Sequence, residues 1–289
     1  MKSIEFSPVK ENLPNKREAQ LKGLYGSMKH MSERTNAEVG FELVKDDGTV
    51  NPEALGGISE AHKKFTEARE TSFAKIDDPS ERQRFANTYK VDLNNDSQIS
   101  GMMLEDWHNK KRETKSAMLE MLVTTVFYKA LGKDYLVVRS STYDDYKNGV
   151  DLIIVNKKTG EVIGTFDEVH DRRFGDRTAE KNQKIIKQAK NGGVSIEYCP
   201  TIDNGRVKKE KRSNVPNFYL LLTIDELDEA LENVDFSDLD NLSDYEQKIF
   251  TKFASSIMQQ AEMLSQQEGI APILMKRLNK VSEFFAQAV

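Results

Sequence analysis

Residue types that build cofactor and covalent sites are scarce in this chain of 289 residues. Cys199 is the single cysteine, which excludes an intramolecular disulfide and a cysteine-based zinc site. The four histidines, His30, His62, His108 and His170, are scattered without metal-ligand spacing. We therefore expect no zinc centre.

Long apolar runs and an excess of positive charge are also missing. No run approaches the ~18–20 apolar residues that span a bilayer, and the first residues, MKSIEFSPVKENLPNKREAQ, hold no apolar signal core. We therefore expect a cytoplasmic protein with no membrane partner. The formal net charge of −5 argues against bulk attraction to nucleic acid, but it leaves room for a local basic face.

The composition, with 38% hydrophobic and 31% charged residues, suits a sizeable core in one large or two ordinary domains. Residues 1–57 are polar and interrupted by prolines, so we expect an extended or flexible segment with one strand at 38–44. Residues 58–112 carry helical patterns, including a helix start at Pro79 behind an Asp78 N-cap. The segment 92–101, DLNNDSQISG, partly matches a calcium loop, but Ser97 replaces the required glycine and an ordinary turn is the better interpretation.

The most informative stretch is a predicted hairpin within residues 143–171. An apolar run, Val150 to Val155, carries one carboxylate, Asp151, near its start, and turn residues follow it. The returning strand ends on Asp167 and Glu168. Two adjacent strands therefore bring carboxylates toward the same end of a sheet.

The register of this hairpin decides which carboxylates meet, and the sequence leaves it open. If Val155 lies opposite Glu161, Asp151 shares a side with Asp167. A slip of one residue puts Glu168 on that side instead. Like charges this close in a partly buried place repel each other, so one pKa should rise unless a cation intervenes. A divalent metal with oxygen ligands is such a cation.

A long helical stretch, Leu104 to Leu131, precedes the hairpin, and its second half leaves almost no polar face. A helix that is apolar all round is buried. Glu120 lies inside it, where a carboxylate is costly unless it is paired or binds something. Two interpretations stay open: a salt bridge to a neighbouring Lys or Arg, or a contact with a bound ligand.

Basic residues follow the hairpin in two places. The helix expected at Thr178 to Asn191 carries Lys181 and Lys184 in its first half. A basic loop is expected at Arg206 to Arg212, between two further apolar runs. Such a loop is usually a soluble hairpin tip, and beside a nucleic-acid site it becomes a candidate phosphate contact.

Residues 224–289 are expected to form packing helices. Thr223 with Glu226, and Ser243 with Glu246, are capping boxes that open two of them. These helices would cover the sheet or form a homodimer contact.

The hairpin resembles a known family. An apolar strand with Asp near its start, a hairpin and a second strand ending in an acid pair are similar to the core of the PD-(D/E)XK nuclease superfamily, which includes restriction endonucleases and Holliday-junction resolvases. The resemblance covers roughly residues 115–223. Val150 stands where the motif has proline. The acid-x-Lys element reads Glu168-Val169-His170, or Asp167-Glu168-Val169 in the other register, so the motif lysine is absent.

The resemblance implies a fold and a site. The fold is α+β or α/β, with a restriction-endonuclease-like mixed central sheet in residues 113–223, flanked by helices and extended by helical N-terminal and C-terminal additions. The implied ligands of Mg²⁺ or Mn²⁺ are Asp151 and Glu168 or Asp167, with Glu120 from the preceding helix. The water-orienting role of the missing lysine would fall to His170, Lys184 or Lys181. The implied function is metal-dependent hydrolysis of phosphodiester bonds in nucleic acid, DNA more than RNA.

Two other functions stay open. In the first, a nuclease-like fold that has lost catalysis only binds nucleic acid, and the absence of the motif lysine favours this alternative. A structural or interaction protein would hold the acids in salt bridges, with Arg139, Arg172 and Arg173 near enough in sequence to be partners.

Overall fold

The computed structural model describes residues 16–70, 79–92, 95, 98, 100, 102–103, 106–107, 114–171, 178–203 and 206–289. A four-stranded sheet lies at its centre, in the order β1-β2-β3-β6. The strands are β1 (Tyr135–Arg139), β2 (Leu152–Asn156), β3 (Val162–Asp171) and β6 (Asn217–Thr223). The first three are antiparallel neighbours and β6 runs parallel to β3, so the expected mixed sheet flanked by helices is confirmed.

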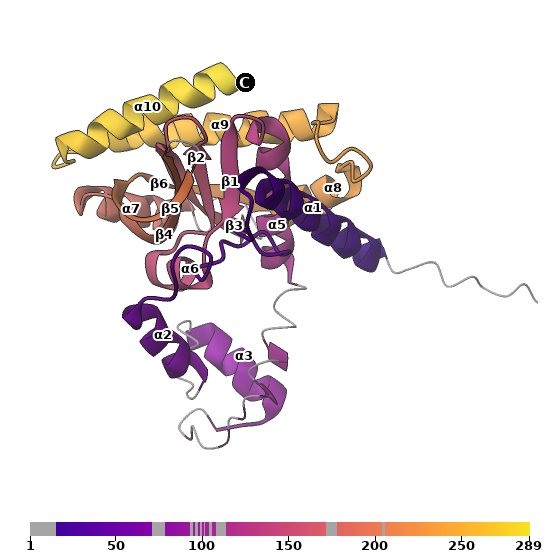
Figure 1. Ribbon diagram of the computed structural model, residues 1–289. Coiled ribbons are helices and arrows are strands. Elements are labelled where there is room, and N and C mark those ends of the chain that lie inside the picture. Colours follow the sequence, from indigo (N-terminus) through magenta and orange to yellow (C-terminus); the bar gives the residue numbers. More distant parts are fainter. Residues whose placement is uncertain are drawn as a thin grey trace, which may run out of the picture.

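One face of the sheet packs against three helices. They are α5 (Lys115–Leu131), α9 (Asp244–Ser265) and α10 (Pro272–Ala288). The ring of Phe127 on α5 lies 5.7 Å from Phe166 on β3, 5.4 Å from Phe250 on α9 and 6.2 Å from Phe285 on α10, between centroids. Such aromatic contacts bury large apolar areas. Figure 1 shows α9 and α10 side by side across the top of the sheet.

The expected buried helix is confirmed in its second half, and it begins later than predicted. Thr114 is the N-cap of α5 and accepts a hydrogen bond from the backbone N–H of Ala117. Most residues between 104 and 113, including the basic cluster at 110–112, lie outside the described residues.

The other face of the sheet carries α7 (Thr178–Lys190), where the Tyr219 hydroxyl on β6 lies 3.0 Å from the Asn182 side-chain oxygen. The free edge of β6 is covered from α9. Gln260 accepts from the backbone N–H of Tyr219 at 3.0 Å and donates to its carbonyl at 2.8 Å. Unpaired backbone groups on an edge strand invite association, and Gln260 satisfies two of them inside the fold.

A second sheet of two antiparallel strands, β4 (Val194–Asp203) and β5 (Arg206–Val215), follows α7. The prediction of a basic loop at 206–212 is wrong, because these residues form most of β5. Lys208 pairs with Thr201 and Arg212 with Ile196 across the ladder. A two-stranded ribbon exposes much of its surface, so charged residues can occupy a strand without an apolar alternation.

Residues 16–39 form a helix, α1 (Lys16–Val39), which corrects the expectation that 1–57 is extended or flexible. Its buried residues recur at helical spacing and pack toward α5: Leu24, Met28, Met31 and Thr35. The strand expected at 38–44 is also wrong, since Val44 makes only an isolated bridge with Val50. The helix occupies part of the proline-free interval after Pro14, where no residue stops it.

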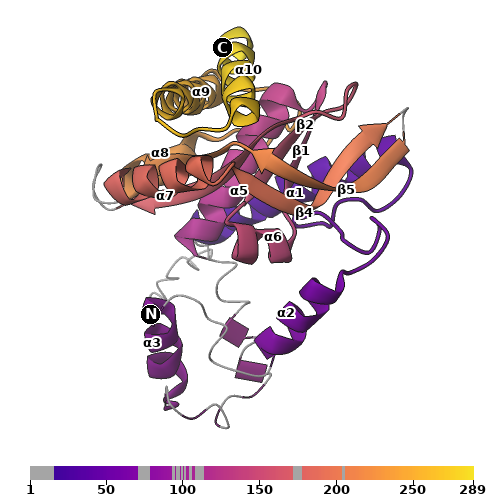
Figure 2. The same ribbon diagram turned by 90° about the vertical axis from the view of Figure 1, so that its left-hand side faces the viewer.

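Two further helices, α2 (Glu60–Glu70) and α3 (Pro79–Tyr89), lie below the sheet in Figure 2. α3 begins at Pro79 as predicted, and Asp78, its expected N-cap, lies outside the described residues. Phe85 and Ala86 of α3 form a small cluster of their own with nearby aromatic residues. Most of the calcium-like segment 92–101 lies outside the described residues.

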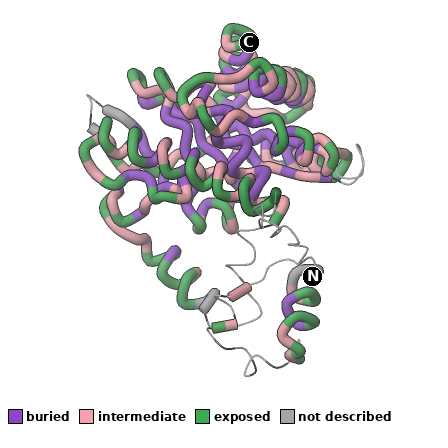
Figure 3. The backbone as a smooth tube through the Cα atoms, turned by 90° about the vertical axis from the view of Figure 1, so that its right-hand side faces the viewer, coloured by how far each residue is buried: buried purple, intermediate pink, exposed green. Residues whose placement is uncertain are grey.

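Both predicted capping boxes are confirmed. Thr223 and Glu226 open α8 (Ile224–Asn233), and Ser243 and Glu246 open α9. Figure 3 shows the buried residues gathered in the sheet and in the helices packed on it. Among the described residues no helix is long and apolar enough to cross a membrane.

Candidate active site

The β2–β3 hairpin changes register on its way to the site. At the turn Val155 lies opposite Val162, as in the second expected register, but closer to the site Leu152 lies opposite Phe166. A β-bulge between Ile154 and Val155 accommodates the difference. Bulges re-aim side chains, so neither expected register holds along the whole hairpin.

Asp151 stands directly before β2 and is tied to the end of β3 by two hydrogen bonds. Its backbone N–H donates to the Phe166 carbonyl at 2.8 Å, and its Oδ2 accepts from the backbone N–H of Glu168 at 2.8 Å. Because side chains alternate along a strand, Glu168 shares the face of Phe166, which packs on α5. The structure therefore brings Asp151 and Glu168 together.

The carboxylate of Glu168 is buried beside the carboxyl group of Asp151, with which it can share a side-chain hydrogen bond when one of the two is protonated. Both of its oxygens are inaccessible to solvent, and no N–H or hydroxyl group of the described residues donates to either of them. Burial raises the pKa of Glu168 well above its usual range, and the neighbouring Asp151 raises it further. The pKa of Asp151 is also raised well above its usual range. Burial is the largest cause and the negative charge of Glu120 is the second. The expected repulsion between acids is therefore present in this pair.

Glu120 reaches the same region from α5, in an ion pair. Arg139, at the end of β1, donates through Nη2 to Glu120 Oε2, and through Nη1 to the Asp47 carbonyl at 3.1 Å. The two side chains of the pair are only 18% and 26% exposed. Burial lowers the pKa of Arg139, but Glu120, Asp47 and the acid pair more than offset this and raise it. The salt-bridge interpretation of Glu120 therefore has a direct contact behind it.

Asp167 points to the opposite face of β3, toward α7. Its Oδ2 accepts from the ammonium groups of Lys181 at 2.8 Å and Lys184 at 2.6 Å. Lys181 and Lys184 thus reach a carboxylate, as the sequence suggested, but they contact Asp167 and not the Asp151–Glu168 pair. Of the two acids that the register left open, Glu168 is the one that meets Asp151.

His170, the buried Asp144 before β2, and the arginines considered as partners lie in separate positions. His170 follows Glu168 by two residues on β3, so strand alternation places it on the same face. Asp144 is fully buried and accepts from the backbone N–H groups of Glu197 at 2.7 Å and Tyr198 at 3.0 Å, which is a structural role joining α6 (Thr142–Asn148) to β4. Arg172 and Arg173 lie outside the described residues.

The donor set for a metal is small. Among the described residues no group of three or more His, Cys, Asp or Glu is arranged to hold a metal ion. Asp151 and Glu168 remain available, since Glu120 pairs with Arg139 and Asp167 pairs with two lysines. One or two carboxylates are enough for Mg²⁺, which keeps several waters and takes oxygens from substrate phosphates. The unpartnered oxygens of Glu168 have the required chemistry, so the pair fits a Mg²⁺ or Mn²⁺ site with two protein carboxylates.

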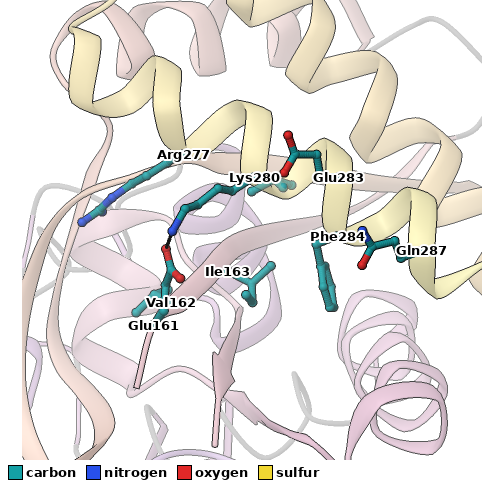
Figure 4. Close-up of a pocket in the computed structure, with 9 residues that line it drawn as sticks. Glu161, Val162, Ile163, Arg277, Lys280, Glu283, Phe284 and Gln287 are labelled. Carbon is teal, nitrogen blue, oxygen red and sulfur yellow. Dashed lines mark hydrogen bonds and ion pairs between the residues drawn. The ribbon is translucent and has the colours of Figure 1, made fainter. Parts of the chain in front are cut away.

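A hollow of about 220 Å³ lies elsewhere, between the β2–β3 turn and α10. Figure 4 shows Lys280 of α10 reaching across it to Glu161, with Nζ 2.6 Å from Oε1. Arg277 and Phe284 also line it. None of these residues belongs to the acid pair, and the sequence patterns gave no signal for this hollow.

The chain matches no protein-family model, no curated protein and no solved structure. The functional argument therefore depends on the geometry of the acid pair and its surroundings.

Proposed function

We propose that this protein is a metal-dependent nuclease that hydrolyses phosphodiester bonds in nucleic acid, with DNA favoured over RNA. The observation that carries the proposal is the contact between Asp151 and Glu168, in which the oxygens of Glu168 are buried and unpartnered. Burial and repulsion both oppose ionisation of such a pair, so it lowers stability at neutral pH. Strongly shifted carboxyl groups gathered at one place are typical of functional sites.

The order of elements supports the resemblance to the PD-(D/E)XK core. A buried helix, α5, leads into three antiparallel strands and brings Glu120 close to the acid pair. Asp151 precedes β2 and Glu168 lies near the end of β3, the neighbouring strand. These are the places that the family motif gives to its acids.

The residues of the chain would divide the work as follows. Asp151 and Glu168 would hold Mg²⁺ or Mn²⁺, which when bound supplies a water of lowered pKa and offsets charge on the phosphate. His170 occupies the motif position of the lysine, and we assign it the role of accepting a proton from the attacking water. Arg139 would keep a permanent positive charge beside the pair while it holds Glu120 in place.

A nucleic-acid binder without catalysis is the second candidate. Two observations favour it: the motif lysine is replaced by His170, and Glu120 is engaged by Arg139 and so withdrawn from the donor set. Such a binder would share the fold and the substrate class but cleave nothing.

Cleavage of a mixed panel tests the proposal: linear, supercoiled, single-stranded and branched DNA, and RNA, each with Mg²⁺ or Mn²⁺. Asp151→Asn should abolish cleavage, as should a chelator. Asp134→Asn is the matched control, because Asp134 is 55% exposed in the turn before β1 and pairs only loosely with Lys158, at 3.6 Å. Failure of the wild type to cleave any substrate would refute the nuclease, and retained binding would then favour the second candidate.

A further inference from the structure

The cluster on the α7 face of β3 carries an excess of positive charge. The ammonium groups of Lys181 and Lys184 both contact one oxygen, Oδ2 of Asp167, at 2.8 and 2.6 Å. One carboxylate offsets only one of the two cationic side chains, so the cluster carries an excess of about one positive charge. Two ammonium groups brought this close repel each other unless a further anion joins them.

The cluster also lies close to the acid pair along the chain and in space. Asp167 directly precedes Glu168, and alternation along β3 puts the two on opposite faces. Lys184 reaches the turn before Asp151: a Cβ at Gly149 would lie 3.1 Å from its Nζ. Gly149 has a φ of 63° and ends α6, a position that favours glycine. Lys184 therefore lies against the segment of residues 149–151 that carries Asp151.

The start of α7 adds two features that suit an anion. Thr178, Lys181 and Lys184 are spaced by three residues, so they line one side of this 13-residue helix from its first turn. The hydroxyl oxygen of Thr178 is buried and has no hydrogen-bond partner among the described residues. A helix N-terminus favours phosphate through its free N–H groups and its dipole.

Exposure of the two lysines fits a binding role. The Lys184 side chain is 40% exposed, whereas Lys181 and Asp167 are 18% and 13% exposed. The Lys184 side chain is thus the more accessible of the two, and Lys181 is largely enclosed. Asp167 orients both while no anion is present.

We infer that Lys181 and Lys184, with Thr178, form a phosphate-binding subsite that holds the backbone of a nucleic acid beside the acid pair. This inference rests on the proposed function for its ligand class. A phosphate at the subsite would position the chain so that an adjacent phosphodiester reaches Asp151 and Glu168. Backbone contacts of this kind fix the position of a nucleic acid without reading its sequence.

Binding without cleavage provides the first test. Fluorescence anisotropy of labelled single-stranded and duplex DNA is measured with the full chain in chelator, over a series of salt concentrations. The double variant Lys181→Gln, Lys184→Gln should bind about tenfold more weakly at low salt and lower the salt slope by roughly one to two. The control is Lys187→Gln, Lys190→Gln, which removes two exposed lysines from the last turns of the same helix and should change little.

The sign of the effect at Asp167 separates a binding site from a structural ion pair. Asp167→Asn removes the competing carboxylate, so it should tighten DNA binding several-fold, provided that thermal melting shows a folded protein. If the cluster were only structural, this variant would bind equally or more weakly. Weaker binding by folded Asp167→Asn, or equal losses in the two lysine double variants, would overturn the subsite.

The outcomes distinguish this inference from the proposed function. DNA binding that depends on the lysines, without metal-dependent cleavage, would refute the proposed nuclease activity and support the phosphate-binding subsite. Cleavage that depends on Asp151, with normal DNA binding by the Lys181→Gln, Lys184→Gln variant, would refute the subsite and support the proposed nuclease activity. Absence of DNA binding by the wild type would overturn the subsite directly.

Discussion

Replacing Glu168 with glutamine should stabilise the protein at neutral pH while abolishing cleavage. The amide keeps the shape of the carboxyl group and removes the charge that burial and Asp151 oppose. The folded-state pKa of Glu168 lies above its unfolded value of about 4.3. Stability contributed by the protonated group is therefore complete below that value and is lost as the pH rises through the folded-state pKa.

The size of the effect follows from this linkage. Between the two pKa values the wild type loses up to about 1.4 kcal/mol of unfolding free energy per pH unit. At pH 8 we expect Glu168→Gln to gain roughly 1–2 kcal/mol, the usual size when a strained functional group is relieved. For a chain of this length that is roughly 2–3 °C in Tm. At pH 4 the gain should vanish, because the wild-type group is protonated in the folded state.

Thermal melts of both proteins in chelator, from pH 4 to pH 8, measure this. Glu120→Gln is the matched control with the opposite sign: it leaves Arg139 partly buried without its anion and should cost about 1–3 kcal/mol. A Glu168→Gln protein that melts at or below the wild-type temperature at pH 8 would refute the reasoning. So would a gain that persists unchanged at pH 4, because it could not come from the charge.

Three further predictions concern metal binding and the core. Mn²⁺ should raise the Tm of the wild type but not of Asp151→Asn. At a hundredfold excess over Kd, the bound metal adds about 2.7 kcal/mol to the free energy of unfolding, and equal Tm shifts in the two proteins would contradict the metal site. Lys129→Met should cost about 3–5 kcal/mol in urea unfolding because Glu246, fully buried, loses its cation, and adding Glu246→Gln, which keeps the acceptor for the Ser243 backbone N–H, should recover most of the loss. Gln260→Leu should cost about 1–3 kcal/mol by leaving Tyr219 backbone groups unpaired, and an unchanged urea midpoint would contradict this.

Elements with strong local signals were predictable from the sequence. The capping boxes at Thr223 and Ser243 fix helix starts through side-chain contacts within a few residues. The buried half of α5 and the hairpin likewise carry apolar patterns that can be recognised within the segment itself. Such signals need no knowledge of the rest of the fold.

Elements that depend on distant partners were not predictable. α1 has a weak apolar stripe, and its packing on α5 from 76 or more residues away makes it a stable helix. β5 is highly charged and becomes a strand by pairing with β4. Tertiary context decided both, against the local pattern.

The candidate site was predictable as a set of residues but not as an arrangement. The pairing of Asp151 with Glu168 depends on a bulge at Ile163, opposite Ile154 and Val155, and the only local signal for it is Gly164 inside the strand. The resemblance also implied that Lys181 or Lys184 could reach the carboxylates, without showing on which face of β3 they would lie. Strand alternation fixes the face only after the register is known.

The core treats two sets of buried charges in opposite ways. Lys129 and Glu246 are fully buried, but each has the other at 2.6 Å, and Lys129 also donates to the Asp235 carbonyl. Glu168 is buried without such a partner and stands against another acid. The same fold encloses the matched ion pair of Lys129 and Glu246, so it does not need an unmatched buried acid such as Glu168 for stability. The unmatched acid therefore calls for a functional reason. We propose that this reason is a divalent cation, which Asp151 and Glu168 would hold. Arg139 on one face and Lys181 with Lys184 on the other would add positive charge that suits a nucleic-acid phosphate.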